Sequence, residues 1–116
     1  MTNITYDLEE RTAKFGEDII EFCKSIKLNQ ITKPVINQLV RSGTSVGANY
    51  MEANGASSKK DFRNKIFICK KEVQETKHWL RMVVKADIRY QKNCKKIWLE
   101  AQELTLIFGK IVSSLR

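Results

Sequence analysis

The sequence predicts an all-α protein: one domain over residues 1–116 that folds as an antiparallel up-down four-helix bundle. Three observations predict this class. Apolar residues recur at alternating intervals of four and three, which places them on one side of a helix. One proline and five glycines in the chain favour long helices over a turn-rich β fold. Short connections make consecutive helices antiparallel neighbours. The expected helices cover about residues 7–27, 33–54, 59–86 and 91–115.

The first expected helix has acidic residues at its start and basic residues at its end. Asp7, Glu9 and Glu10 lie in its first turn, and Lys24 and Lys27 lie near its end. A helix dipole favours this arrangement. The expected core stripe of this helix is Leu8, Thr12, Phe15, Ile19, Phe22 and Ile26.

The second expected helix is unusual because its middle is rich in small residues. Thr32 is expected to be the N-cap, and Pro34 fits the first turn, where its missing N–H has no cost. Gly43 and Gly47 each cost roughly 1 kcal/mol relative to alanine inside a helix. A strand is the competing assignment, but glycine weakens strands too and the segment shows no alternation. We therefore expect the small residues to let a neighbouring helix approach closely.

The third and fourth expected helices have regular core stripes. Ser58 followed by Asp61 resembles a capping box that starts the third helix. The stripe of the third helix is Phe62, Ile66, Cys69, Val73, Thr76, Leu80 and Val83. The stripe of the fourth is Cys94, Ile97, Ala101, Leu104, Phe108, Ile111 and Leu115.

Positive charge is concentrated in one part of the chain. Residues 59–96 contain thirteen lysines and arginines against four acids, a net charge of +9, whereas the whole chain carries +8. At about 100° per residue, six cations of the third helix fall in an arc roughly 80° wide, about 110° from its core stripe. These six are Lys59, Arg63, Lys70, Lys77, Arg81 and Lys85, and Lys92, Lys95 and Lys96 extend the region into the fourth helix.

This arc predicts a surface that contacts the phosphates of a nucleic acid. Cations without interspersed acids repel each other, which costs stability unless a polyanion is bound. Such contacts give salt-dependent and largely sequence-independent affinity. Two alternatives stay open: an acidic protein partner without nucleic-acid binding, and a surface that serves only solubility. Phe67 lies in the same arc and is a candidate for stacking on a base or for a subunit contact.

Several apolar residues point away from the expected core. They are Ile68, Trp79 and Met82 on the third helix and Leu99 and Leu106 on the fourth. A helix that is apolar on two sides usually has two partners, which predicts a homo-oligomer with these residues at its interface. The alternative is that a single four-helix bundle buries these residues without a second subunit.

The residues do not indicate an enzyme, a metal site or a cofactor. Glu75 and His78 form a Glu-x-x-His step of the kind found in di-iron bundles, but His78 is the sole histidine and the set cannot be completed. No phosphate-binding glycine loop or nucleophile elbow is present. Three cysteines outside any C-x-x-C motif fit buried thiols in a reducing cytoplasm. We also expect no secretory signal, because residues 1–10 are mildly acidic and lack an apolar segment. We expect no membrane span, because the longest uncharged stretch is short and polar.

The middle of the chain resembles the four-helix-bundle family of 23S rRNA intervening-sequence proteins, to which the accessory variability determinant protein of diversity-generating retroelements looks related. The resemblance is strongest over residues 38–80. Its signature residues are Arg41, Ser42, Ser45, Asn49, Glu52, Asp61, Phe62, Glu72, Glu75 and Trp79. We interpret most of them as defining fold and assembly, with Arg41 pairing with Glu72 and Glu75.

The resemblance implies a ring-like homopentamer without known catalytic activity. For the retroelement branch it implies a basic surface that engages nucleic acid and a reverse transcriptase. For the intervening-sequence branch it implies an open frame within a ribosomal RNA gene. The sequence does not distinguish the two branches.

Overall fold

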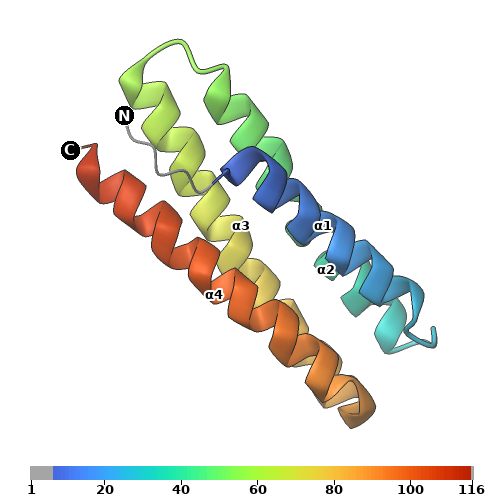
Figure 1. Ribbon diagram of the computed structural model, residues 1–116. Coiled ribbons are helices and arrows are strands. Elements are labelled where there is room, and N and C mark those ends of the chain that lie inside the picture. The colour runs from blue at the N-terminus through green and yellow to red at the C-terminus, as the bar shows by residue number, and fades with distance from the viewer. Residues whose placement is uncertain (1–6, 116) are drawn as a thin grey trace.

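The computed structural model describes residues 7–115, which form an elongated bundle of four helices measuring 45 × 22 × 21 Å. The helices are α1 (Leu8–Lys24), α2 (Thr32–Asn54), α3 (Lys59–Ala86) and α4 (Gln91–Ser114), and a 3-10 turn, η1 (Ile88–Tyr90), precedes α4. Consecutive helices run in opposite directions along the long axis (Figure 1). The prediction of an all-α, up-down bundle is therefore confirmed.

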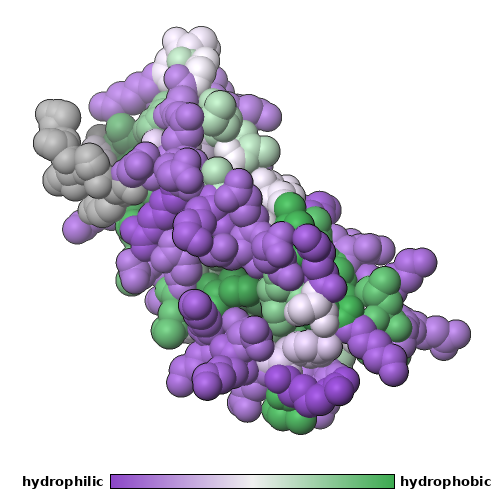
Figure 2. Space-filling model, turned by 45° about the vertical axis from the view of Figure 1, so that its right-hand side comes forward, coloured by the Kyte–Doolittle hydropathy of each residue, from purple (hydrophilic) through white to green (hydrophobic). Residues whose placement is uncertain are grey.

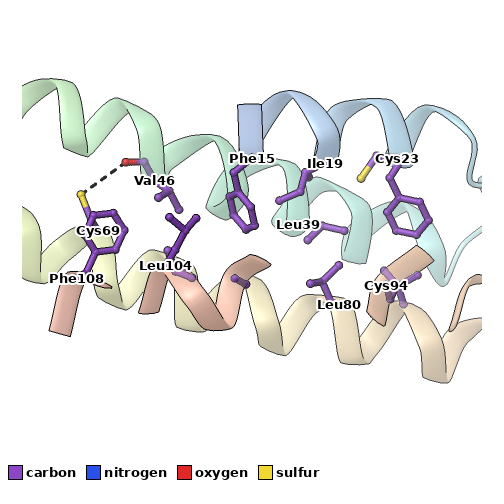
Figure 3. Packing of buried hydrophobic residues seen from close by; sticks show 14 of the residues in the cluster. Phe15, Ile19, Cys23, Leu39, Val46, Cys69, Leu80, Cys94, Leu104 and Phe108 are labelled. Carbon is purple, nitrogen blue, oxygen red and sulfur yellow. Dashed lines mark hydrogen bonds between the residues drawn. The ribbon is translucent and has the colours of Figure 1, made fainter. Parts of the chain in front are cut away.

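All four helices contribute to one apolar core. The largest side chains that are completely enclosed include Ile19 of α1, Leu39 of α2, Ile66 of α3 and Phe108 of α4. They belong to a continuous cluster along the bundle axis (Figure 3). Burial of this apolar surface is the main stabilising contribution to the fold, at about 25 cal/mol per Å² removed from water.

The small residues of α2 allow close packing against α1, as the sequence predicts. A Cβ atom added to Gly47 would lie 3.3 Å from the carbonyl oxygen of Thr12, and one added to Gly16 would lie 3.3 Å from the Cα of Thr44. A Cβ atom on Gly43 would overlap the side chain of Ile19. The glycines thus bring the two helix backbones together at positions where any side chain would hold them apart.

The starts of α2 and α3 test the expected caps, and one of them differs from the expectation. Ser58 has extended backbone angles, and its hydroxyl accepts a hydrogen bond from the backbone N–H of Asp61 at 3.0 Å, which confirms the cap of α3. The prediction that Thr32 caps α2 is wrong. The side-chain oxygen of Asn29 instead accepts from the N–H groups of Ile31 and Thr32, at 2.8 Å each. Asn29 lies three residues earlier, and asparagine side chains readily bond to backbone N–H groups two or three residues on.

The first helix ends three residues before the expected boundary, at Lys24. The hydroxyl of Ser25 donates to the carbonyl of Phe22 at 2.6 Å, and the N–H of Lys27 donates to the hydroxyl of Tyr90 at 3.1 Å. This second bond ties the α1–α2 connection to the turn before α4, so the chain leaves the helix early to reach a residue far away in the sequence.

Helices α1 and α4 approach each other less closely than any other neighbouring pair. The guanidinium of Arg11 bridges the gap, at 2.7 Å from Glu100 and 2.7 Å from Glu103. The core is therefore most open along this edge, whereas α3 is firmly packed between α2 and α4. Among residues 7–115, no helix has both the length and the apolar character that crossing a membrane requires.

Candidate nucleic-acid interface

The basic arc of α3 lies along its junction with α4. The ammonium of Lys77 donates to the side-chain oxygen of Gln102 at 2.5 Å and lies 4.8 Å from the ring centroid of Trp98. The guanidinium of Arg63 donates to the carbonyl of Val112 at 3.4 Å. The middle of the arc is thus partly covered by α4, and its charged groups emerge at the edge of that helix.

Cations gather at both ends of this junction. At one end, Arg81 and Lys85 of α3 and Lys95 of α4 line a groove. At the other end, Lys59 and Arg63 lie beside Leu115 in a shallower depression. Between these ends, the ammonium of Lys70 lies over Gly109, where an added Cβ would be 3.7 Å away. The predicted phosphate-contacting residues of α3 therefore form a row along the bundle axis.

The cations predicted on α4 do not all join this row. Lys92 and Lys95 are exposed in the first turns of α4. Lys96 instead lines the groove between α1 and α4, where Asp18, Glu21 and Glu100 are also present. Because successive residues of a helix differ in direction by about 100°, Lys95 and Lys96 fall on different sides of α4. Lys96 therefore lies in a surrounding of mixed charge.

The predicted cations have no acidic partners within residues 7–115. None of the nine forms a salt bridge there, whereas six other cations do, among them Arg11, Arg41 and Lys65. Of these six, Arg41 pairs with Glu72 and Glu75, which lie on the opposite edge of α3. The sequence predicts that positive and negative side chains of α3 are separated. In the structure they lie along two different edges of this helix.

The edge of α3 that faces α2 contains the paired charges. The guanidinium of Arg41 lies 3.3 Å from Glu72 and also pairs with Glu75, as the sequence analysis expects. Glu75 accepts a further hydrogen bond from the indole N–H of Trp79 at 2.9 Å. The pKa of the Glu75 carboxyl is lowered, first by this indole and then by Arg41. Lys65 pairs with Glu52 at 2.9 Å.

The residues expected at an oligomer interface fall on two different surfaces. Leu99 and Leu106 are exposed on α4, with 54% and 62% of their surface accessible. Ile68, Trp79 and Met82 are half-buried on α3, and Trp79 packs against the core of the bundle. Each leucine of the exposed pair thus has a larger exposed fraction than any of the three residues of α3. Figure 2 shows one face of the molecule, on which hydrophobic patches are separated by hydrophilic side chains.

Two residues on the α3–α4 side are not predicted as site residues from the sequence. Trp98 is 38% exposed and Ile88 is 65% exposed, and both line the groove that contains Arg81 and Lys95. Trp98 follows Cys94 by four residues, and this spacing alone suggests a side chain at the border of the apolar core. The clue in the sequence is its neighbourhood, because Lys95 and Lys96 lie three and two residues before it.

The three cysteines are buried and unpaired, as predicted. Burial raises the pKa of Cys23 to about 11 and the pKa values of Cys69 and Cys94 to about 12, because a thiolate is poorly solvated in an apolar core. The thiol of Cys69 donates to the carbonyl of Val46 at 3.6 Å (Figure 3). The thiols therefore stay protonated at neutral pH and serve as small core residues.

In the part of the chain that the structure describes, no group of three metal-ligating side chains comes together.

The architecture is that of a small helical bundle with one cation-rich edge, and comparison with known proteins places it in a family. The family model of the 23S rRNA-intervening sequence protein matches residues 5–110. The chain therefore belongs to the family of 23S rRNA intervening-sequence proteins, as its signature residues suggest.

A solved structure agrees with this placement. The chain is similar to a protein of unknown function from the S23 ribosomal protein family of Bacteroides thetaiotaomicron, with 28% sequence identity and a TM-score of 0.78. The match covers 90% of this chain and 97% of that one. None of the curated proteins compared with the chain matches it in sequence.

Proposed function

We propose that this protein is a non-enzymatic, homo-oligomeric accessory protein that binds nucleic acid or a ribonucleoprotein through the cation row of α3. The observation that carries the proposal is that these cations lack acidic partners among residues 7–115, although Glu72 and Glu75 lie on the opposite edge of the same helix. A row of like charges is unfavourable in the free protein, and binding a polyanion relieves the repulsion and releases condensed counterions.

The proposed assembly is a ring-like homopentamer, as the family resemblance implies. Exposed Leu99 and Leu106 lie seven residues apart, so they share one direction on α4 and form an apolar strip. The acidic residues of α1 offer a surface of opposite charge on another side of the protomer: Glu9, Glu10, Glu17, Asp18 and Glu21. A head-to-tail contact between unlike surfaces closes into a ring when its rotation permits.

Binding to RNA tests the nucleic-acid part of the proposal. Lys70, Arg81, Lys85 and Lys95 are replaced together by glutamine, which removes four charges and keeps long polar side chains. We expect the slope of log affinity against log salt to decrease in magnitude by about 3, because each phosphate contact on a single strand contributes about 0.7. The measurement is fluorescence anisotropy with a labelled RNA at several salt concentrations.

The matched control removes the same number of charges from the α1–α2 side. Lys14, Lys24, Lys27 and Lys33 are exposed there, and their joint replacement by glutamine gives the same net charge. The control is expected to retain most of the salt slope. Equal losses in the two variants would mean that only net charge matters and that the row on α3 is not the contact surface.

The alternative function is a structural module whose partner is an acidic protein. The exposed apolar residues among the cations favour this alternative. For the retroelement branch, the expected protein partner is a reverse transcriptase. Absence of RNA binding at moderate salt, together with salt-sensitive retention of an acidic polypeptide on the wild-type protein but not on the α3–α4 variant, would favour this alternative.

Light scattering tests the assembly. The proposed pentamer has five times the chain mass of 13.5 kDa. Replacing both Leu99 and Leu106 with glutamate places charge in the apolar strip, and we expect the assembly to dissociate. A wild-type protein that stays monomeric at micromolar concentration contradicts the proposed assembly.

A further inference from the structure

One end of the α3–α4 junction forms a groove with an apolar floor and a cationic rim. Leu80 and Val84 of α3, Ile88 of η1, and Cys94 and Trp98 of α4 make the apolar part. Arg81, Lys85 and Lys95 lie at the rim with Gln91. The groove has a volume of about 600 Å³, within the range of sites that hold small organic groups. Among residues 7–115, no carboxylate lines it.

The apolar surface of this groove is incompletely covered by the protein itself. Ile88 is 65% exposed and Trp98 is 38% exposed, and both are large side chains whose exposure to water is unfavourable. The ammonium of Lys77 lies 4.8 Å from the centroid of the Trp98 ring, which brings the cation row of α3 to the indole. The groove therefore combines apolar surface and an aromatic ring with the positive charge that runs along the helix.

The chemistry of the groove selects a ligand with a flat apolar part next to a negative charge. A base with its adjoining phosphate has both parts, and bases stack on aromatic side chains irrespective of their identity. In a duplex, the faces of the bases are closed by their stacked neighbours, so only an unpaired base can enter. The thiol of Cys94 on the floor is protonated at neutral pH because burial raises its pKa to about 12, so it does not repel a phosphate.

The position of the groove connects it to the proposed phosphate row. Arg81 and Lys85 belong both to the groove and to the basic arc of α3, which continues through Lys77 and Lys70 towards Lys59. At 1.5 Å per residue, the arc from Lys59 to Lys85 extends over roughly 39 Å, enough for several nucleotides of an extended strand.

We infer that this groove is a docking site for an unpaired base, and that the protein therefore prefers single-stranded nucleic acid, or a loop, over a duplex. The inference rests on the proposed function and deepens it by naming the class of nucleic acid. Trp98 and the apolar floor contact the base, and Arg81, Lys85 and Lys95 contact the flanking phosphates.

The test compares an oligouridine strand with an RNA duplex that has the same number of phosphates. Wild-type protein is expected to bind the single strand more tightly at equal salt. Trp98→Ala is expected to weaken single-strand binding about tenfold, the effect of losing one stacking contact, and to change duplex binding less than twofold. Trp98→Phe keeps an aromatic ring and is expected to retain most of the affinity, which separates loss of stacking from loss of folding.

The fluorescence of Trp98 provides a second test that does not depend on the Trp98→Ala variant. The chain contains two tryptophans, so Trp79→Phe leaves Trp98 as the only indole. Addition of the single strand is expected to quench its fluorescence, whereas the duplex leaves the fluorescence unchanged. If the wild type binds strand and duplex equally and neither moves the Trp98 signal, the inference is wrong and the proposed function stands.

Other outcomes separate failure of the proposed function from failure of the inference about the base. If neither RNA binds at low salt, the proposed function fails and the inference falls with it. If polyglutamate quenches Trp98 and displaces oligouridine at equal charge concentration, the groove serves an acidic polypeptide, and the assignment to a base is overturned.

Discussion

Along its edge with α2, helix α3 has paired charges and tight contacts, whereas along its edge with α4 its cations have no acidic partner within residues 7–115. On the first edge, Arg41 is bound by Glu72 and Glu75, and the hydroxyls of Ser42 and Thr76 lie 2.9 Å apart inside the bundle. On the second edge, Lys77 contacts only neutral groups of α4 among the described residues. Helix α3 thus stabilises the fold with one edge and keeps the charge of the other edge available.

The largest expected effect concerns two leucines that differ in burial. Leu39 of α2 is fully buried, whereas Leu99 of α4 is 54% exposed. Leu39→Ala is expected to lower the free energy of unfolding by about 2–5 kcal/mol, because it removes core contacts and leaves a cavity. Leu99→Ala is expected to change it by less than about 0.5 kcal/mol in the monomer. Urea denaturation of both variants measures the difference.

A smaller effect is expected from the hydroxyl pair between α2 and α3. Thr76→Val keeps the shape of the side chain but leaves the buried hydroxyl of Ser42 without this contact, which is expected to cost about 1–2 kcal/mol. Thr105→Val is the matched control, since the hydroxyl of Thr105 donates only to the carbonyl of Ala101 in its own helix, at 2.8 Å. Similar losses of stability in the two variants would show that the contact between the helices contributes little.

The smallest expected effect comes from the Arg41 pairs, which are partly exposed. Arg41→Gln is expected to cost about 0.5–1 kcal/mol at neutral pH and low salt. The folded pKa of Glu75 lies below its ordinary value of 4.5, so its contribution to stability is present above pH 4.5 and is lost as the pH falls through the folded pKa. Thermal denaturation between pH 7 and pH 3 should therefore show a shallower loss of stability in the variant than in the wild type. Parallel pH profiles would contradict a role of Arg41 in lowering this pKa.

Much of the local structure follows from short-range rules. The hydroxyl of Ser58 and the N–H of Asp61 are three residues apart, so their cap can be predicted from spacing alone. The glycines of α2 predict a close helix neighbour, but they do not identify α1 as that neighbour. Thr32 shows the limit of such rules, because several polar residues near a helix start can cap it, and the loop geometry selects Asn29.

The candidate site is less predictable because it depends on neighbours. The angle of the basic arc relative to the core of α3 can be worked out from the helical period, but which helix lies at that angle cannot. The groove at Trp98 is made by residues of α3, η1 and α4, whose approach is set by packing. Lys96 is adjacent to Lys95 in sequence and still lines a different groove.

The four helices, their order, the cap of α3 and the separation of positive from negative charge on α3 can all be predicted from the amino-acid sequence. These features depend on the helical period and on residues within about one turn of each other. Three further features become visible only in the folded bundle: the basic arc borders α4, Trp79 packs against its own bundle, and Trp98 lines one groove with Arg81 and Lys95. These outcomes depend on how the helices pack against each other, since each surface is built from residues far apart in the chain.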